Sequence, residues 1–290
     1  MSFAGTHTAL VTPFRGGKFD PDAFRSLIED QIAGGITGIV PVGTTGESPT
    51  LDYNEHNEVI RAAIEAAAGR CPVIAGTGSN STSEAIALTV EAERLGADAA
   101  LLVAPYYNKP SQEGLYRHFR AVAESVQIPV VLYSIPGRCG VEIGVETVAR
   151  LAGACSNIRT IKEAGGSVER VSQLRASLPA DFEILSGDDS LTLPFLSVGA
   201  VGVISVASNL FPAEISKMVR LWLDGDPSSA QDLHRRFYAL FKDLFIEPNP
   251  VPAKYGLSLR GKMSAEVRLP LCEMSEANAA RVRKTLEALQ

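Results

Sequence analysis

Lys162 stands at the end of a short apolar run, within the stretch "NIRTIKEAGG" that begins at Asn157. A lysine ammonium normally stays in water. Burial removes its hydration and lowers its pKa, and the resulting neutral amine can attack a ketone to form a Schiff base. In an extended strand Thr160 and Lys162 share one face, while Arg159 points the other way. The alternative interpretation is a lysine just past the strand that pairs with Glu163.

Hydroxyl groups that could serve such an amine occur at the ends of other apolar runs. Tyr133 ends one of them, and its phenol could relay protons during imine formation, with Thr44 or Thr45 extending the relay. An ordinary strand tyrosine is the commoner case. Tyr106 and Tyr107 are neighbours in an extended segment, so at most one of them faces a given pocket.

Two features of the sequence could bind anions. The segment "VGTTGES" offers successive backbone N–H groups between Gly43 and Gly46, an arrangement that binds carboxylates or phosphates. Arg138 lies in "IPGRCG", and its guanidinium could hold a carboxylate through two parallel hydrogen bonds. A tight turn and a surface arginine are the ordinary interpretations of these two features.

The elements that must position these residues follow a regular pattern. Mostly continuous apolar runs, typical of strands buried on both faces, occur at 8–14, 37–42, 72–78, 99–105, 129–136, 158–164, 182–187 and 201–207. Segments with helical periodicity lie between them, for example 20–35, 81–97 and 111–127. The pattern predicts an α/β fold, a (β/α)8 TIM barrel with its active site at the carboxyl ends of the strands. A doubly wound open sheet is the rival, but no G-x-G-x-x-G fingerprint follows the first run.

Beyond the eighth apolar run the pattern becomes helical, at 212–225, 228–245 and 275–290. We expect residues 1–222 to form the barrel that carries the active site. Residues 223–290 are expected to form a C-terminal helical region that covers the barrel or mediates self-association.

Composition excludes several classes of protein. The chain has 290 residues and a net charge of -6, and it has no basic run, which argues against nucleic acid and membrane partners. No apolar run reaches the ~18 residues of a membrane-spanning helix. The four histidines and four cysteines show no spacing typical of metal sites. Free thiols and no recognisable export signal predict a cytoplasmic protein, and we expect no metal site.

Five motifs, in this order, resemble the dihydrodipicolinate synthase family of lysine-dependent aldolases, which includes N-acetylneuraminate lyase. They are "VGTTGES", "PYYNKPSQEGLYRHF", "YSIPGRCG", "IKEA" and "SGDD". The likeness extends from about Phe3 to "EPNPVPAKYGL" and to "VRLPL" near Val267. It implies a lyase that condenses pyruvate, bound as a lysine Schiff base, with L-aspartate 4-semialdehyde in the diaminopimelate route of lysine biosynthesis.

The resemblance also implies roles for individual residues. Lys162 would form the Schiff base, Tyr133 and Thr44 would relay protons together with Tyr107 from a partner subunit, and no cofactor would be needed. Substrate-binding roles fall to the backbone of Thr45, the guanidinium of Arg138, and the backbones of Gly187 and Ile204.

The sequence departs from the family pattern at two positions near Arg138. Ser134 replaces an asparagine and Cys139 replaces a threonine, whereas Tyr133 and Arg138 are retained. Arg138 favours the synthase over relatives that act on polyhydroxylated chains. An N-acetylneuraminate lyase or a 2-keto-3-deoxy sugar acid aldolase is therefore the alternative, and a barrel that only binds a keto acid is a third hypothesis.

Many members of this family are inhibited by L-lysine at a dimer interface. Residues that match the pattern of that site are Ser48, His56, Asn80, Glu84 and Tyr106. Pro49 and Tyr53 depart from it. The resemblance thus implies L-lysine as a candidate effector. It also implies a homo-oligomer, either a dimer or a dimer of dimers, in which Tyr107 reaches the neighbouring site.

Overall fold

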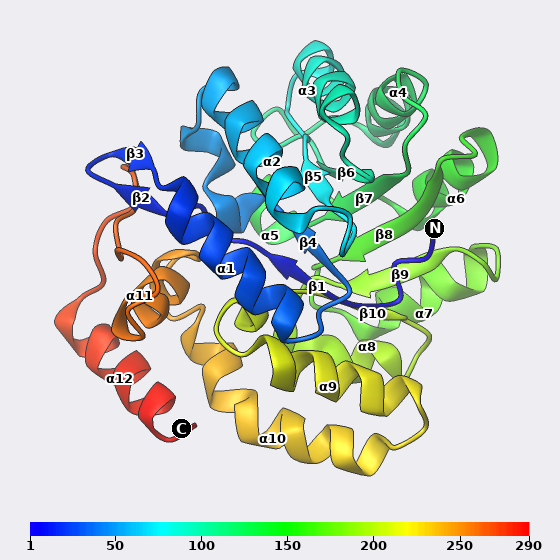
Figure 1. The fold of residues 1–290 in the computed structure, drawn as a ribbon. Helices are drawn as coiled ribbons and strands as arrows, with labels where there is room; N and C mark the ends of the chain where they lie inside the picture. The colour runs from blue at the N-terminus through cyan, green and yellow to red at the C-terminus, as the bar shows by residue number, and fades with distance from the viewer. Residues whose placement is uncertain (290) are drawn as a thin grey trace.

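The apolar runs form the strands of a closed parallel barrel, as predicted (Figure 1). In the computed structural model, which describes residues 1–289, the eight barrel strands are β1 (Gly5–Ala9), β4 (Gly38–Val40), β5 (Ile74–Gly76), β6 (Ala99–Val103), β7 (Val130–Ser134), β8 (Ile158–Glu163), β9 (Glu183–Ser186) and β10 (Gly202–Ser205). They are hydrogen-bonded in the order β4-β1-β10-β9-β8-β7-β6-β5. A parallel bridge between Ile39 and Val73 joins the β4 and β5 ends of this order.

Side chains alternate along each strand between two hydrophobic layers. One set, which includes Leu101, Val131 and Leu185, fills the inside of the barrel. The other set, which includes Leu132 and Ile161, packs outward against the surrounding helices. This alternation decides which side chains near the strand ends can face the interior.

Helices surround the barrel, and capping groups mark ends of two of them. They are α1 (Pro21–Ala33), α2 (Tyr53–Ala67), α3 (Thr82–Leu95), α4 (Gln112–Ala123), α6 (Val145–Ala154), α7 (Val168–Ser177), the short α8 (Thr192–Leu196) and α9 (Pro212–Leu223). Asp20 accepts a hydrogen bond from the Ala23 N–H at the start of α1. Gly96 ends α3 with φ of 100°, a conformation that glycine adopts without strain.

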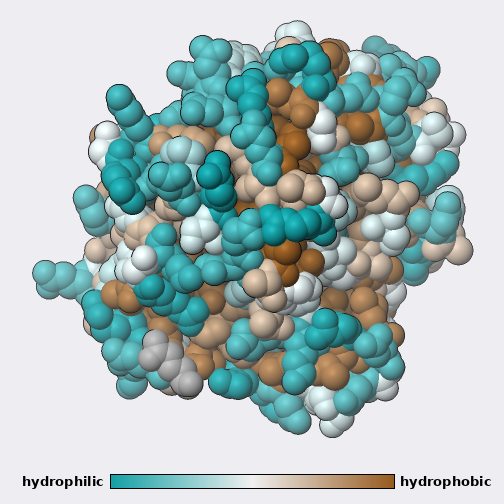
Figure 2. Space-filling model, in the orientation of Figure 1, coloured by the Kyte–Doolittle hydropathy of each residue, from teal (hydrophilic) through white to brown (hydrophobic). Residues whose placement is uncertain are grey.

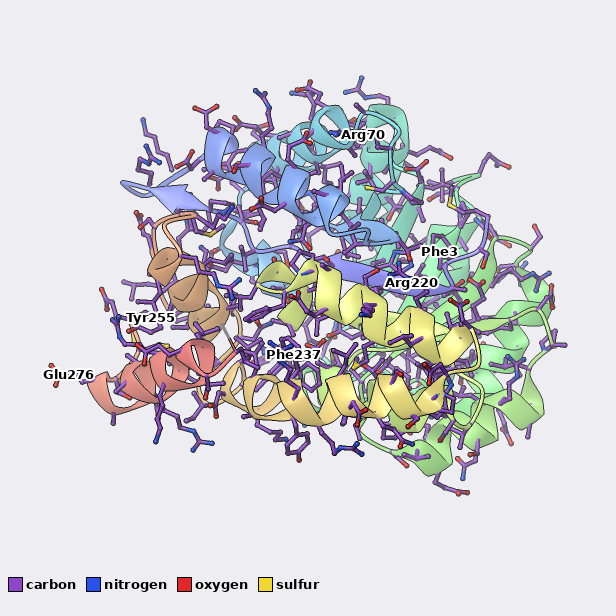
Figure 3. All side chains as sticks on the ribbon, turned by 60° about the horizontal axis from the view of Figure 1, so that its bottom comes forward. Phe3, Arg70, Arg220, Phe237, Tyr255 and Glu276 are labelled. Atoms are coloured by element: carbon purple, nitrogen blue, oxygen red, sulfur yellow. The ribbon has the colours of Figure 1, made fainter. Side chains whose placement is uncertain are left out.

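Three further helices form the C-terminal part of the chain: α10 (Pro227–Asp243), α11 (Val251–Leu259) and α12 (Glu276–Glu287). Phe237 of α10 is buried and meets the ring of Phe211 edge to face, with ring centroids 5.0 Å apart (Figure 3). Helix α12 packs against both α10 and α11. Hydrophilic side chains cover most of the face seen in Figure 2, and hydrophobic ones are confined to patches between them. The division of the chain at residue 222 stays a prediction.

The structure differs from the sequence prediction in three places. The first strand spans Gly5–Ala9 rather than residues 8–14, and it begins earlier than predicted because the polar residues Thr6 and His7 are buried within it. Helix α11 was not predicted, since its prolines conceal the pattern, yet Pro252 lies in its first turn, where proline is tolerated. The hairpin of β2 (Phe14–Arg15) and β3 (Lys18–Phe19) was also missed. The last predicted helix reaches residue 290, which lies outside the described residues.

Candidate active site

Lys162 lies inside the barrel, near the carboxyl end of β8. Its side chain is 7% exposed, and its Nζ lies 4.1 Å from the centroid of the Tyr133 ring. Strand pairing explains this contact, because Tyr133 of β7 and Lys162 of β8 are direct partners in the sheet. Arg159 points the other way and donates to the Ala152 carbonyl of α6. The predicted alternation along this strand is therefore confirmed.

The surroundings of Lys162 favour an uncharged amine. The pKa of Lys162 is lowered to about 7, chiefly by burial; the Asp189 carboxylate opposes this effect, and the positive charge of Arg138 supports it. Glu163 faces outward, where its carboxylate accepts from Arg170 Nε at 2.8 Å and from the Gly165 N–H at 2.7 Å. The alternative interpretation, an ion pair between Lys162 and Glu163, is therefore wrong. At neutral pH a large share of Lys162 is neutral and nucleophilic.

Tyr133 presents its buried phenol to the same space. Burial raises the pKa of Tyr133 to about 12, against the opposing effects of the Arg138 charge and of a hydrogen bond with Thr44. The phenol therefore stays protonated at neutral pH, next to a hydroxyl and an amine. This arrangement can pass a proton between a reacting group at Lys162 and the Thr44 hydroxyl.

A tight turn follows β4 and carries both threonines. It is the 3₁₀ turn Thr44–Gly46, and it is flanked by two residues in the left-handed region, Val42 at φ 50° and Glu47 at φ 55°. This conformation is strained for a β-branched residue such as valine. Among the described residues, no acceptor binds the backbone N–H of Thr44 or Thr45. The turn thus presents two free donors, as a carboxylate site requires.

The other predicted substrate-binding residues lie around Lys162. Arg138 is exposed, in the short helix α5 (Pro136–Cys139), and its charge acts on both Lys162 and Tyr133. Gly187 follows β9, and a Cβ atom there would come within 2.6 Å of the Ala164 Cβ and 3.1 Å of the Lys162 Cε, so the close packing requires glycine. Ile204 of β10 belongs to the hydrophobic cluster inside the barrel.

Tyr107 does not reach this site within its own chain. Its side chain is 91% exposed, and its φ of 69° turns it away from Tyr106. The predicted separation of the two tyrosines is confirmed, because Tyr106 lines a different pocket.

Sequence reasoning missed one buried carboxylate near the amine, that of Asp189. It accepts from the N–H groups of Val206 and Ala207, both at 3.0 Å, and from the Ser205 hydroxyl. Its negative charge raises the pKa of Lys162. The motif "SGDD" contains this residue, but the pattern alone does not show which of its two aspartates is buried.

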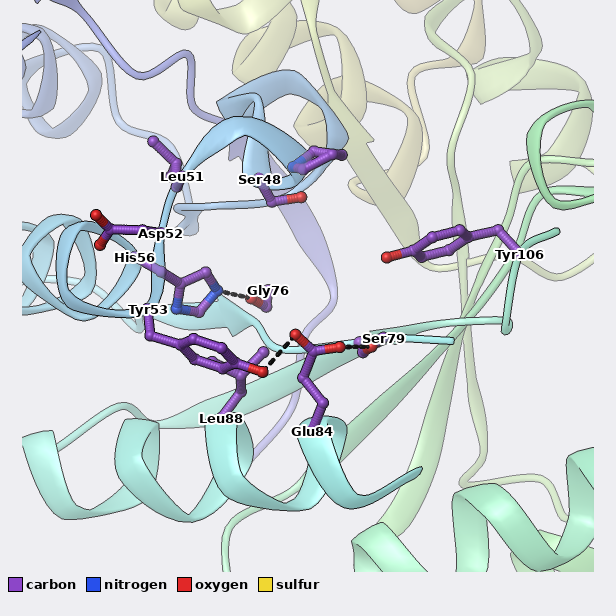
Figure 4. A pocket seen from close by; sticks show the side chains of 12 residues that line it. Ser48, Leu51, Asp52, Tyr53, His56, Gly76, Ser79, Glu84, Leu88 and Tyr106 are labelled. Atoms are coloured by element: carbon purple, nitrogen blue, oxygen red, sulfur yellow. Dashed lines mark hydrogen bonds between the residues drawn. The ribbon is translucent and has the colours of Figure 1, made fainter. Parts of the chain in front are cut away.

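A second pocket, of 590 Å³, is lined by Ser48, two residues after the turn Thr44–Gly46 (Figure 4). Four of the five residues that match the effector site line it, namely Ser48, His56, Glu84 and Tyr106. The fifth, Asn80, borders it and donates to the Tyr106 carbonyl at 3.3 Å. Ser48, Gly76 and Gly78 also line a small inner cavity that Thr44 and Tyr133 share. The two spaces are therefore neighbours.

The side chains of this second pocket are already engaged with one another. Glu84 accepts from the Tyr53 phenol at 2.6 Å and from the Ser79 hydroxyl. These two hydrogen bonds lower the pKa of Glu84. His56 Nε2 is hydrogen-bonded to the Gly76 carbonyl at 2.9 Å, and burial lowers the pKa of His56. The pocket therefore presents a carboxylate beside an uncharged histidine.

Residues 1–289 contain neither a metal-ligand cluster nor a membrane-spanning helix. No three histidine, cysteine, aspartate or glutamate side chains are grouped there as metal ligands. No helix in that part of the chain is both long and apolar enough to cross a bilayer.

A buried amine of lowered pKa that faces a phenol inside a (β/α)8 barrel is the arrangement expected of a Schiff-base-forming lyase. The sequence model of the Dihydrodipicolinate synthetase family matches residues 2–289. The chain belongs to this family.

Individual relatives cover almost the whole chain. The 4-hydroxy-tetrahydrodipicolinate synthase of Endomicrobium trichonymphae is 51% identical over 98% of this chain and 98% of its own length. A solved structure of the enzyme of that name from Methylacidiphilum fumariolicum SolV is 57% identical, with a TM-score of 0.98 over 99% of this chain and 96% of the other. A lysine-bound structure from Cyanidioschyzon merolae is 43% identical, with a TM-score of 0.96 over 99% and 98% of the two chains.

Proposed function

We propose that this chain is a 4-hydroxy-tetrahydrodipicolinate synthase, a lyase that condenses pyruvate with L-aspartate 4-semialdehyde. The observation that carries the proposal is the buried Lys162 amine, which lies 4.1 Å from the Tyr133 ring and whose pKa burial lowers to about 7. The near full-length similarity to enzymes of that name supports the choice of reaction. The reaction belongs to the diaminopimelate route of lysine biosynthesis.

The first half of the reaction uses the amine, the phenol and the turn. Pyruvate places its carboxylate on the free N–H groups of Thr44 and Thr45, which brings its ketone carbon to Lys162. The amine attacks that carbon, and the oxygen leaves as water after receiving protons through Tyr133 and Thr44. Loss of a methyl proton from the imine then gives an enamine, because the imine nitrogen accepts the electron pair.

The second half needs a second anion site. Arg138 binds the carboxylate of the aldehyde, and the enamine carbon attacks the aldehyde carbon to form a carbon–carbon bond. The amino group of the new chain then attacks the imine carbon and displaces Lys162, which closes the ring and frees the amine. Gly187 and Ile204 contribute backbone contacts close to the imine.

A pyruvate-dependent aldolase that accepts sugar-derived aldehydes is the alternative candidate. It shares the amine, the phenol and the turn, and it differs in the acceptor site. Arg138 favours the synthase, since a guanidinium suits the carboxylate of the semialdehyde better than a chain of hydroxyls.

We further propose that the working protein is a homo-oligomer in the cytoplasm. The 91% exposure of the Tyr107 side chain suits a residue that completes a neighbouring subunit's proton relay. The buried free cysteines Cys71, Cys139 and Cys155 suit a reducing compartment. Analytical ultracentrifugation that finds a monomer with full activity would contradict the role of Tyr107.

L-lysine is the proposed effector of the second pocket. The Glu84 carboxylate could bind an ammonium group there, but the Tyr53 phenol already occupies one of its oxygens. We therefore expect Tyr53→Phe to strengthen inhibition by L-lysine severalfold, because it frees that oxygen. An inhibition curve for each variant measures this effect, and rates unchanged by millimolar L-lysine in both would refute the effector role.

One experiment tests the proposed reaction. The chain is given pyruvate and either L-aspartate 4-semialdehyde or a sugar-derived aldehyde, with Lys162→Ala as the control. We expect turnover with the semialdehyde alone, and none in the Lys162→Ala variant. Turnover only with the sugar-derived aldehyde would establish the alternative, and binding of pyruvate without turnover would establish a non-enzymatic role.

A further inference from the structure

The turn that carries Thr44 and Thr45 is held in place by hydrogen bonds from residues that are distant in the sequence. Asn249, which precedes α11, is buried and donates from its Nδ2 to the Thr45 Oγ1 at 2.9 Å. Because the Thr45 oxygen accepts this bond, its own proton is directed elsewhere. One C-terminal side chain thus orients a hydroxyl in the candidate pyruvate site.

Glu47 forms hydrogen bonds that hold the other end of the same turn. Its carboxylate is buried and accepts from Lys254 Nζ of α11 at 2.5 Å and from the backbone N–H of Arg268 at 3.0 Å. Lys254 is itself fully buried and also donates to the Glu266 carbonyl at 2.7 Å. Both oxygens of Glu47 are therefore bound by the C-terminal part of the chain.

The backbone of this turn needs such support. Val42 and Glu47, on either side of Thr44–Gly46, both adopt the left-handed region that non-glycine residues avoid. A strained conformation persists only where its surroundings fix it. Within the barrel, the Thr12 hydroxyl supplies a further bond to the Gly46 carbonyl at 2.7 Å. Asn249 binds Thr45, and Lys254 binds Glu47. Thr45 and Glu47 are the two residues on either side of Gly46.

We propose that Asn249 and Lys254 are positioning residues, which hold the Thr44–Thr45 turn in the geometry that binds the pyruvate carboxylate. This inference rests on the proposed function. It assigns the C-terminal helical region a part in recognition of the first substrate, exerted through the turn. Arg138 would bind the second substrate, and neither Asn249 nor Lys254 is hydrogen-bonded to its segment, so the effect is expected on pyruvate alone.

The test compares two altered chains with a matched control. Asn249→Ala removes the bond to Thr45. Lys254→Met alone leaves a buried carboxylate unpaired, so it is paired with Glu47→Gln, which keeps the shape and removes both charges. The control is the double variant of Asp243 and Arg281, D243N/R281M, which removes an ion pair of 2.8 Å between α10 and α12 without touching the turn.

The readout is the pyruvate concentration that gives half-maximal trapping by borohydride, with thermal unfolding as a check of folding. We expect this concentration to rise about fivefold to tenfold in Asn249→Ala, the effect of one lost hydrogen bond, and by at least as much in E47Q/K254M. Trapping at saturating pyruvate should stay complete, because Lys162 is untouched. The control should match the wild-type chain, and the KM for the semialdehyde should change less than about twofold in every variant.

Two results would overturn the inference while leaving the proposed function intact. One is an unchanged half-saturating concentration in folded Asn249→Ala and E47Q/K254M. The other is an equal shift in the D243N/R281M control, which would mean that any weakening of the C-terminal region has this effect. A wild-type chain that forms no pyruvate adduct would instead refute the proposed function, and the inference with it.

Discussion

Two lysines are buried among the described residues, and their surroundings differ in one decisive way. Lys162 and Lys254 each lie 4.1 Å from the centroid of an aromatic ring, Tyr133 and Phe14 respectively. Lys254 has a carboxylate at 2.5 Å and donates to a carbonyl as well. Lys162 makes no ion pair with any carboxylate of residues 1–289 within 4.0 Å.

This difference separates a structural lysine from a nucleophile. Burial lowers the pKa of both amines. At Lys254 the adjacent Glu47 carboxylate raises the pKa and favours the ammonium, so the charge stays and joins two segments. At Lys162 burial is the largest effect, and it outweighs the Asp189 carboxylate, which raises the pKa without forming an ion pair, while the Arg138 charge lowers the pKa as well. A buried lysine becomes reactive where no carboxylate forms an ion pair with it.

The largest effect is expected at Lys162. Lys162→Met should lower turnover at least about a thousandfold, because no other group can form the imine. Steady-state kinetics with both substrates measures this, and Lys262→Met, which removes a half-exposed lysine on the surface, is the matched control. If Lys162→Met keeps more than a tenth of the turnover, Lys162 is not the nucleophile and the two lysines do not differ in this way.

At Lys254 we expect substitution to lower the stability of the fold. Lys254→Met should reduce the free energy of unfolding by about 3–5 kcal/mol, because it leaves the buried Glu47 carboxylate without its ion-pair partner. Urea unfolding measures this loss, and the added substitution Glu47→Gln should restore most of it. Equal stabilities of Lys254→Met and the wild-type chain would show that this pair is not structural.

Tyr133 sharpens the comparison, because Phe14 occupies the same place beside Lys254 without a hydroxyl. Tyr133→Phe should lower kcat about a hundredfold, the usual contribution of a positioned proton donor. The ring is kept, so stability should change little. If single-turnover measurements show an unchanged rate of imine formation in this variant, the phenol does not relay protons.

The cost of an uncharged amine should appear in stability against pH. The pKa of Lys162 is about 7 in the folded chain and 10.5 unfolded, so the unfolded chain binds more protons between these values. Wild-type stability therefore gains from rising pH across this window. Lys162→Met should be more stable than the wild-type chain by about 2–4 kcal/mol at pH 7 and by much less above pH 10. Urea unfolding at both pH values checks this, and an advantage that does not shrink would contradict the lowered pKa.

The sequence predicted much of the barrel and of the site for a physical reason. Alternation along one strand places Lys162 inward and Arg159 outward, and parallel strands bring their carboxyl ends together. Tyr133, Thr44 and Lys162 could therefore be grouped from their places in the apolar runs alone. The start of the first strand was misjudged because its buried His7 looks like a surface residue in the sequence.

The contacts that hold the Thr44–Gly46 turn could not be predicted in this way. Glu47 and Lys254 are 207 positions apart, and neither periodicity nor spacing reports a contact between a loop and a later helix. Asp189 illustrates the same limit, since its two backbone donors come from the end of a different strand. Such contacts depend on how elements pack, which a single sequence does not encode locally.

The pH dependence of borohydride trapping by pyruvate tests the central claim most directly, with the modified residue located by peptide mass spectrometry. An amine with a pKa of about 7 predicts that the trapping rate rises with pH, reaches half its maximum near pH 7 and then levels off, with all the added mass on Lys162. A rate that is still rising steeply above pH 9, or an adduct on any other lysine, would contradict the account.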